Sequence, residues 1–150
     1  MFLKNSKYTR LYDVIISLTL IFLFLPLLVL IFIICFLESG KPIYTQIRIG
    51  KNQKAFKIIK FRTMLLDTPS LSTHLISKGS VTNFGKFIRK FKLDELPQLI
   101  NVIKGEMSLV GPRPCLLNQY ELIEERERYN IFLVRPGITG LSQIRGIDMS

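Results

Sequence analysis

The sequence predicts an α+β fold that is mainly helical, with an N-terminal re-entrant membrane helix, a small β-hairpin, and amphipathic or core helices at the cytoplasmic face of a membrane. Three observations predict it. Residues 14–37 form a stretch of 24 residues without a charge. Two segments rich in β-branched and aromatic residues flank a turn-like tetrapeptide at 50–53. Apolar residues then recur at helical spacing within 84–104. We divide the chain into a membrane segment, 1–40, and one cytoplasmic domain, 41–150.

The uncharged stretch is long enough to span a bilayer. Pro26 lies near its middle, where it removes a helical hydrogen bond and favours a kink. Both flanks are basic, and basic flanks stay in the cytoplasm, so both ends belong on the same side of the membrane. We therefore predict a re-entrant helix that bends near Pro26. An ordinary kinked span and a buried core helix are the alternatives.

The positive charge of the chain is concentrated in residues 41–113. The chain has 21 Lys and Arg against 11 Asp and Glu, a net charge of +10, and this segment alone carries 14 basic and four acidic residues. Such a field attracts polyanions. Because the basic segment follows an apolar anchor, we expect membrane lipid and phosphorylated substrates as partners, and no nucleic acid. The two cysteines, Cys35 and Cys115, show neither a disulfide framework nor metal-ligand spacing, which favours a reducing, cytosolic environment.

A β-hairpin is predicted after the membrane segment, with strands at 42–49 and 55–62. A Ser/Thr-rich stretch at 65–80 is predicted to be a loop. The next segment, 84–91, has apolar residues on one helical face and basic residues on the other. Such a helix suits an anionic membrane surface, and packing of its apolar face on the core is the equal alternative.

A second helix is predicted at 94–104. Asp94 is expected to be its N-cap, and Gly105 stands where a C-terminal cap is expected. The remaining elements are predicted to be a charged helix at 119–129 and two stiff, proline-containing loops at 111–114 and 135–140.

Asp94 and Glu95 form the first candidate site. Two carboxylates at the start of a helix can share one phosphate-bound cation, and a hard ion such as Mg²⁺ prefers carboxylate and phosphate oxygens. A carboxylate can also act as a nucleophile on phosphorus. Taken alone, the pair is more simply explained by capping and by a favourable interaction with the helix dipole.

A set of basic residues forms the second candidate site. A centre that handles a pyrophosphate and a lipid phosphate needs several fixed cations, and arginine has a fork that matches phosphate oxygens. For any one of them, a place on the surface is the default. The candidates are Lys60, Arg62, Arg89, Arg113 and Arg135.

Four motifs occur in a specific order along the chain. They are Lys-Phe-Arg-Thr-Met at 60–64, Leu-Asp-Glu-Leu-Pro-Gln at 93–98, Gly-Glu-Met-Ser-Leu-Val-Gly-Pro-Arg-Pro at 105–114, and Arg-Pro-Gly-Ile-Thr-Gly at 135–140. Together they resemble the bacterial sugar transferase family, the monotopic phosphoglycosyl transferases. The similarity runs from about residue 8 to the end of the chain and outweighs the capping explanation of the acidic pair.

The resemblance implies a Mg²⁺-dependent transfer at the cytoplasmic face of the bacterial plasma membrane. Asp94 would attack the β-phosphate of a UDP-sugar, UMP would leave, and undecaprenyl phosphate would then accept the phosphosugar from Asp94. Glu95 would ligate the metal. Lys60, Arg89 and Arg113 match basic active-site positions of the family, and Arg135 is a weaker match. The reaction would be the first membrane step of a bacterial surface glycan. The stretches 115–127 and 145–150 are similar to those of members that use N-acetylated amino sugars.

The sequence departs from the family pattern in two places. Members commonly have Ser-Pro at the membrane bend, where this chain has Leu25-Pro26, so the bend depends more on the proline. Members usually continue for some tens of residues after the motif at 135–140, and the chain is expected to lack that C-terminal extension. The alternative function is therefore an inactive, truncated membrane-bound fragment or a scaffold in a glycan-assembly complex.

Overall fold

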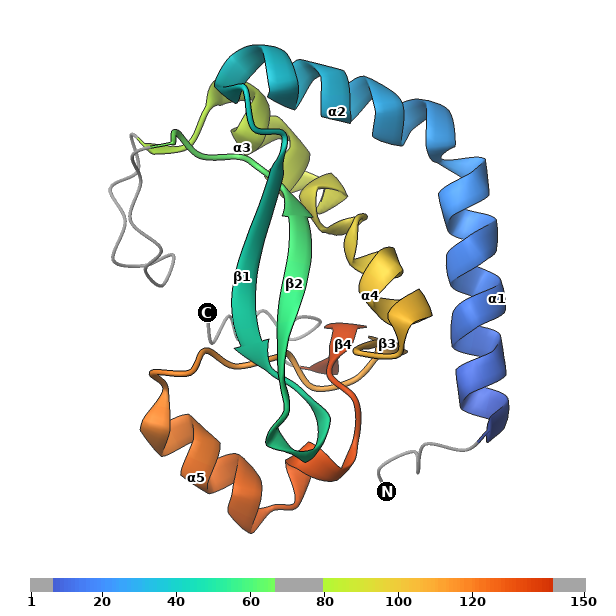
Figure 1. Cartoon of the computed structure of the whole chain (residues 1–150), viewed down its shortest axis with the longest axis vertical. Coiled ribbons are helices and arrows are strands. Elements are labelled where there is room, and N and C mark those ends of the chain that lie inside the picture. The colour runs from blue at the N-terminus through green and yellow to red at the C-terminus, as the bar shows by residue number, and fades with distance from the viewer. Residues whose placement is uncertain (1–6, 67–79, 142–150) are drawn as a thin grey trace.

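The fold is α+β and mainly helical, as predicted (Figure 1). The computed structural model describes residues 7–66 and 80–141. Helices α1 and α2 form an open elbow that encloses α4 and one side of the long β-hairpin, and α5 lies at the far end of that hairpin. The predicted amino-sugar segment at 145–150 and most of the loop at 65–80 lie outside the described residues.

Helices α1 (Lys7–Leu23) and α2 (Leu25–Ser39) meet at an angle of 67°. Phe24 separates them, and Pro26 lies in the first turn of α2, where its missing N–H does not interrupt a helical hydrogen bond. The predicted bend near Pro26 is confirmed. In the described part of the chain, no single helix has the length and apolar character to cross a membrane, whereas this bent pair has both when taken together. Its insertion into a membrane stays a prediction.

Strands β1 (Ile43–Ile49) and β2 (Ala55–Phe61) form the predicted antiparallel hairpin, and the short 3-10 turn η1 (Lys51–Gln53) connects them. Arg48 pairs with Phe56, and Tyr44 pairs with Lys60. Side chains that face each other across a ladder lie on the same face of the sheet. This register therefore places Arg48 and Lys60 on one face of the hairpin.

Helix α3 (Asn83–Lys90) confirms the predicted amphipathic helix, and Thr82 caps it by accepting a hydrogen bond from Gly85 N at 2.9 Å. Its apolar face divides between two environments. Ile88 is fully buried against α2 and the hairpin, whereas Phe87 and Phe91 are more than half exposed. The structure therefore supports core packing for one part of this face and leaves the other part on the surface.

The second predicted helix is split. A 3-10 turn, η4 (Leu93–Glu95), precedes α4 (Gln98–Lys104), and Pro97 occupies the N-cap position of α4. The expectation that Asp94 caps this helix was wrong. Pro97 has no N–H with which to bond the carbonyl four residues earlier, so the chain here uses the tighter bonds of a 3-10 turn. The predicted C-terminal cap is confirmed, since Gly105 has a φ of 86° and its N–H bonds α4 carbonyls.

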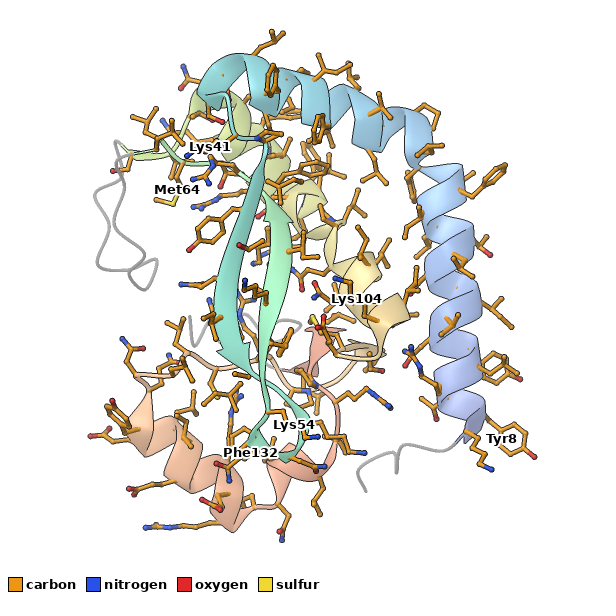
Figure 2. All side chains as sticks on the ribbon, viewed as in Figure 1. Tyr8, Lys41, Lys54, Met64, Lys104 and Phe132 are labelled. Carbon is orange, nitrogen blue, oxygen red and sulfur yellow. The ribbon has the colours of Figure 1, made fainter. Side chains whose placement is uncertain are left out.

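Two short strands, β3 (Ser108–Val110) directly before the first predicted stiff loop and β4 (Gly137–Thr139) within the second, pair in parallel. The charged helix is confirmed as α5 (Tyr120–Arg128), none of whose residues is buried. The 3-10 turn η5 (Ile131–Leu133) follows it and packs against the hairpin tip, where Figure 2 shows Phe132 beside Lys54.

Two apolar clusters hold these elements together. The first cluster joins α2, β2 and α3, and it consists of Ile31, Cys35, Phe61 and Ile88. The second joins β2, α4 and the segment before β3, and it consists of Phe56, Ile58, Val102 and Met107. Strand β2 contributes to both. The turn η4 lies between them, because its Leu93 packs on the first cluster while α4 belongs to the second.

The first half of α1 is attached to α4 and β3 by polar contacts. Arg10 donates to the carbonyls of Val102 and Ile103 at the end of α4. Asp13 is buried and accepts hydrogen bonds from Ser108 Oγ at 2.7 Å and from Leu109 N at 3.2 Å. These bonds join the start of α1 to the end of α4 and to β3. The N-terminal half of α1 is thus part of the folded domain.

Candidate active site

The turn η4 brings the acidic pair to the centre of the molecule. Lys92 adopts a left-handed conformation with φ of 57° directly before this turn, where the chain passes from α3 to α4. Asp94 becomes buried, at 7% exposure, and its Oδ1 has no hydrogen-bond partner within the described residues. Burial raises the pKa of Asp94, and the opposing charges of Lys60 and Arg89 offset only part of that rise. An unpaired, buried carboxylate oxygen is an unusual feature that calls for a ligand.

Glu95 has a very different environment from Asp94. It forms an ion pair of 2.7 Å with Lys60, and the two side chains are only 12% and 18% exposed. Burial by itself would raise the pKa of Glu95, but the charge and hydrogen bond of Lys60, with the charges of Arg113 and Lys92, lower it below its usual value. Lys60 reaches this carboxylate because it points to the same side of β2 as Ile58, two residues earlier. Glu95 is therefore held as an anion.

Arg89 approaches the pair from α3. Its Nε donates to Oγ1 of the buried Thr63 at 2.7 Å, and its charge acts on Asp94. A close approach of backbones makes this possible, because a Cβ on Gly85 would lie 2.4 Å from the carbonyl oxygen of Thr63. Gly85 thus lets α3 lie directly on the segment after β2, with Arg89 one turn further along.

A shallow hollow adjoins Glu95 on its other side. It is small and open to solvent. Its lining includes the Lys60–Glu95 pair, the buried Gln98 of α4, and two arginines, Arg48 of β1 and Arg113 of the loop after β3. Four segments that are distant in the sequence therefore meet around one small, charged space.

Two glycines hold the Arg113 loop in place. A Cβ on Gly137 would lie 2.1 Å from the nitrogen of Gly111, so the two predicted stiff loops cross in backbone contact. Gly137 N donates to Pro112 O at 3.0 Å, and Arg126 of α5 donates to the carbonyl of Arg113 at 2.6 Å. The backbone that carries Arg113 is fixed from two sides.

The structure does not bring every candidate cation to this site. Arg62 donates to the carbonyls of Lys41 and Ile43 and lies over the ring of Tyr44. Arg135 donates to Gly105 O at 2.8 Å, behind the crossing loops. Both arginines are used to bond backbone next to the site. Lys60, Arg89 and Arg113 are the candidates that surround the acidic pair.

Sequence reasoning missed Arg48. The predicted hairpin contained the signal, since its register places this arginine on the same face as Lys60. It also missed Asn101, a buried residue of α4 that accepts from Ile59 N and donates to Lys57 O and Glu106 Oε2. No local pattern marks a buried amide that joins a helix to a strand.

The acidic pair fits a hard divalent cation only if other ligands complete its shell. In residues 7–66 and 80–141, no group of three His, Cys, Asp or Glu side chains comes together. Asp94 and Glu95 supply two carboxylates, one of which has an unpartnered oxygen. Mg²⁺ is commonly held by one or two carboxylates together with water and substrate phosphates, so this donor set suits it better than a cation that needs a full protein cage.

Comparison with known proteins gives relatives along most of the chain. An uncharacterized sugar transferase of Haemophilus influenzae is 38% identical over 161 residues, covering 96% of this chain and 34% of its own length. An undecaprenyl-phosphate galactose phosphotransferase of Salmonella typhimurium is 33% identical, covering 95% and 34%. A UDP-N-acetylgalactosamine-undecaprenyl-phosphate N-acetylgalactosaminephosphotransferase of Aeromonas hydrophila is 39% identical, covering 88% and 32%.

The chain thus spans about a third of the length of these relatives. The family model described as bacterial sugar transferase matches residues 4–150. That range includes the acidic pair, the three cations around it and the crossing loops that position Arg113. This chain belongs to the bacterial sugar transferase family.

Proposed function

We propose that this chain contains the catalytic centre for transfer of a sugar-1-phosphate from a UDP-sugar to undecaprenyl phosphate. The observation that carries the proposal is the buried acidic pair: Glu95 is ion-paired with Lys60, whereas Asp94 keeps an oxygen that has no partner among the described residues. Relatives whose names state UDP-N-acetylgalactosamine and undecaprenyl phosphate support these classes of donor and acceptor.

In the first step, the unpartnered oxygen of Asp94 attacks the β-phosphorus of the donor. A bond forms between that oxygen and phosphorus, the bond from phosphorus to the bridging oxygen breaks, and UMP leaves with the bonding electrons. The sugar phosphate remains on Asp94 as an acyl phosphate. Arg89 and Arg113 stabilise the negative charge on the phosphoryl oxygens.

In the second step, an oxygen of the lipid phosphate attacks the same phosphorus. The bond between Asp94 and phosphorus breaks, the carboxylate is restored, and the sugar is linked to the lipid through a pyrophosphate. Because the acceptor is itself an anion, this step requires no general base. A covalent intermediate lets one cationic site serve a soluble and a membrane-bound substrate in turn.

Mg²⁺ would be held by Glu95 and Asp94 together with substrate phosphate oxygens. When bound, it supplies charge neutralisation at the phosphates. Lys60 holds the Glu95 carboxylate in one place through the ion pair of 2.7 Å. The donor sugar we propose is an N-acetylated amino sugar, and the Aeromonas hydrophila relative, which is named for such a donor, supports it.

We further propose that the α1–α2 elbow inserts into the cytoplasmic leaflet of the bacterial plasma membrane. Large apolar side chains on the elbow are exposed, and Figure 2 shows side chains projecting from its outer face away from the domain. Burying them in lipid would stabilise the inserted state by about 25 cal/mol for each Å² of apolar surface removed from water. From residue 18 to the end of α2, those that are at least half exposed are Leu18, Phe22, Leu23, Val29, Leu30, Phe36 and Leu37.

The test is UMP release by detergent-solubilised protein from a panel of UDP-sugars, with Mg²⁺ and undecaprenyl phosphate. Asp94→Asn should reduce turnover by at least about a thousandfold, because removal of a nucleophile leaves only binding and electrostatic effects. Without the lipid acceptor, mass spectrometry should find one phosphosugar on the peptide that contains Asp94.

Glu121→Gln is the matched control, since it removes an exposed carboxylate from α5. It should keep wild-type turnover. If Asp94→Asn is as active as this control, the nucleophile assignment is wrong. If the wild-type protein binds vesicles but releases no UMP from any donor, the scaffold alternative is favoured instead.

A further inference from the structure

Arg48 is a partly buried cation on the face of the hairpin that looks toward the acidic pair. It lies on β1 opposite Phe56 and lines the same hollow as Lys60 and Glu95. Its Nη2 donates to Gln46 Oε1 at 2.8 Å, and its Nη1 is 3.3 Å from the carbonyl oxygen of Pro114. The Nε atom is buried and has no partner within the described residues. Two of the five guanidinium N–H donors are therefore accounted for.

The charges around the hollow do not balance. Lys60 and Glu95 neutralise each other in the one ion pair found among the described residues. Arg48 and Arg113 line the same space, and within that part of the chain neither has a carboxylate at ion-pair distance. Burial, followed by the charge of Arg113, lowers the pKa of Arg48 to about 10. Two like charges are held together at a free-energy cost that a bound anion would remove.

The chemistry of the hollow narrows the choice of anion. Two guanidinium groups approach it from different segments, and each guanidinium can contact two phosphate oxygens with its planar fork. An anion with two linked phosphates offers enough oxygens, over a sufficient length, to engage both groups at once. The hollow also borders Glu95, the proposed metal ligand, so a diphosphate there would have an oxygen close to the reacting centre.

We propose that Arg48 is a substrate-binding residue, which with Arg113 holds the diphosphate of the nucleotide donor in the hollow beside Glu95. This inference rests on the proposed function. It makes the β1 strand part of the donor site and gives Arg48 a role that Lys60 does not have, since Lys60 is already paired with a carboxylate.

A purely structural role is the competing explanation. Arg48 could serve only to hold the Arg113 loop through Pro114, next to the backbone bond from Ile49 N to Cys115 O at 3.0 Å. A loop-holding residue would affect both substrates and the stability of the fold together. A diphosphate-binding residue would affect the donor alone.

The experiment measures equilibrium binding of UDP and of inorganic pyrophosphate to the full chain in detergent, by calorimetry, for wild type, Arg48→Gln and Arg48→Lys. Arg48→Gln should weaken binding of both by about ten- to a hundredfold, the loss expected for a hydrogen bond to a charged group. Arg48→Lys should recover part of the affinity, because it keeps the charge and loses the fork. Arg128→Gln, an exposed arginine of α5, is the control and should bind as wild type.

Steady-state kinetics provide the second measurement. Arg48→Gln should raise the KM for the UDP-sugar and leave the KM for undecaprenyl phosphate and the melting temperature unchanged. Equal UDP binding by Arg48→Gln and wild type, with UMP release intact in wild type, would overturn this inference alone. The inference would also be overturned if Arg48→Gln raised the KM for both substrates and lowered the melting temperature. A wild-type protein that neither binds UDP nor releases UMP would overturn the proposed function as well.

Discussion

Asp94 and Glu95 are neighbours in the chain, yet their carboxylates are in opposite electrostatic situations. Glu95 is paired with Lys60 and has a lowered pKa, whereas Asp94 has a raised pKa and an oxygen with no partner in residues 7–66 and 80–141. Neighbouring side chains on a tight turn point in different directions, so each meets a different set of groups. This separation allows one carboxylate to stay a fixed anion while the other is available to react.

Lys60→Met should destabilise the protein by about 3 kcal/mol at neutral pH, because it leaves Glu95 buried and unpaired. The wild-type pair contributes stability above the unfolded pKa of Glu95, and this is lost as the pH falls through the lower folded pKa. Lys60→Met removes the largest charge that lowers the pKa of Glu95. The penalty should therefore be greatest at neutral pH and shrink as the pH falls through the folded pKa of Glu95.

Unfolding in detergent, with a chelator present to remove metal, measures this effect. Lys57→Met is the control, since Lys57 is an exposed lysine of the same strand. It should change the free energy of unfolding by less than about 0.5 kcal/mol. A penalty for Lys60→Met that does not depend on pH would contradict the role assigned to the ion pair.

Cys115 should resist alkylation in the folded protein. The thiol is buried at 2% exposure, and burial raises its pKa above the usual 9.0 although Arg126 acts in the opposite direction. The thiolate is the reactive form, and it becomes rarer in the folded state. The raised pKa stabilises the fold below the unfolded pKa, and this contribution is lost as the pH rises through the folded value.

Peptide mapping after treatment with iodoacetamide at pH 8 measures the rate of labelling. Leu117→Cys introduces a matched thiol two residues away, at a position that is 50% exposed. It should react rapidly, whereas Cys115 should react only after denaturation. Equal labelling rates at positions 115 and 117 would show that Cys115 is accessible to the reagent in the folded protein.

Among the elements, the backbone contact between Gly111, directly after β3, and Gly137 of β4 positions one side of the site. Gly111 and Gly137 allow the two backbones to touch, and no larger residue leaves room for this contact. The β3–β4 ladder is short, with Ser108 opposite Gly137 and Val110 opposite Thr139. We therefore expect the stability of this region to depend more on the contact between the two glycines than on ladder hydrogen bonds. Arg113 follows this contact directly and depends on it for its place.

Gly137→Ala should destabilise the protein by about 3 kcal/mol or more, because its Cβ would lie 2.1 Å from the nitrogen of Gly111 and the backbones must separate. Gly40→Ala is the control. Gly40 has a φ of 66° and no atom within 4 Å of an added Cβ, so that variant bears only conformational strain of about 1–2 kcal/mol.

Melting temperatures in detergent, together with UMP release, compare the two variants. Gly137→Ala should lose both stability and activity, since the separation of the loops displaces Arg113. Gly40→Ala should keep its activity. If both variants melt at the same temperature, the close contact between the loops does not govern the stability of this part of the fold.

At the scale of the whole molecule, the elbow and the domain are one unit. Arg10 and Asp13 attach the first half of α1 to α4 and β3, so only the later part of α1 and α2 is available to lipid. An α-helix of 15 to 17 residues is about 23–26 Å long, which is less than the apolar thickness of a bilayer. An elbow that enters and leaves by one surface suits these lengths.

Cysteine labelling in sealed vesicles tests this topology. Lys7→Cys and Lys41→Cys, at the two ends of the elbow, should react with an impermeant reagent from the same side of the membrane. Phe22→Cys, near the bend, should be protected. A spanning helix would instead expose the first two positions on opposite sides, and that result would contradict the re-entrant arrangement.

Most of the local elements could be predicted from the amino-acid sequence. Two segments rich in β-branched and aromatic residues around a turn predicted the hairpin, helical periodicity predicted α3, and Pro26 predicted the bend between α1 and α2. These features depend on contacts between residues that are close in the chain, so a local pattern contains them. The motifs also identified Asp94 and Glu95, whose roles remain predictions.

How these elements combine follows from tertiary contacts, which the sequence did not reveal. In the folded structure Glu95 pairs with Lys60 and Asp94 does not. Arg48 and Arg113 line the same hollow, whereas Arg62 and Arg135 bond backbone carbonyls. The helix is also split at Pro97, and two loops cross at their glycines. The physical reason is that burial, ion pairing and close backbone contact arise between segments far apart in the chain, whose distances no local pattern contains.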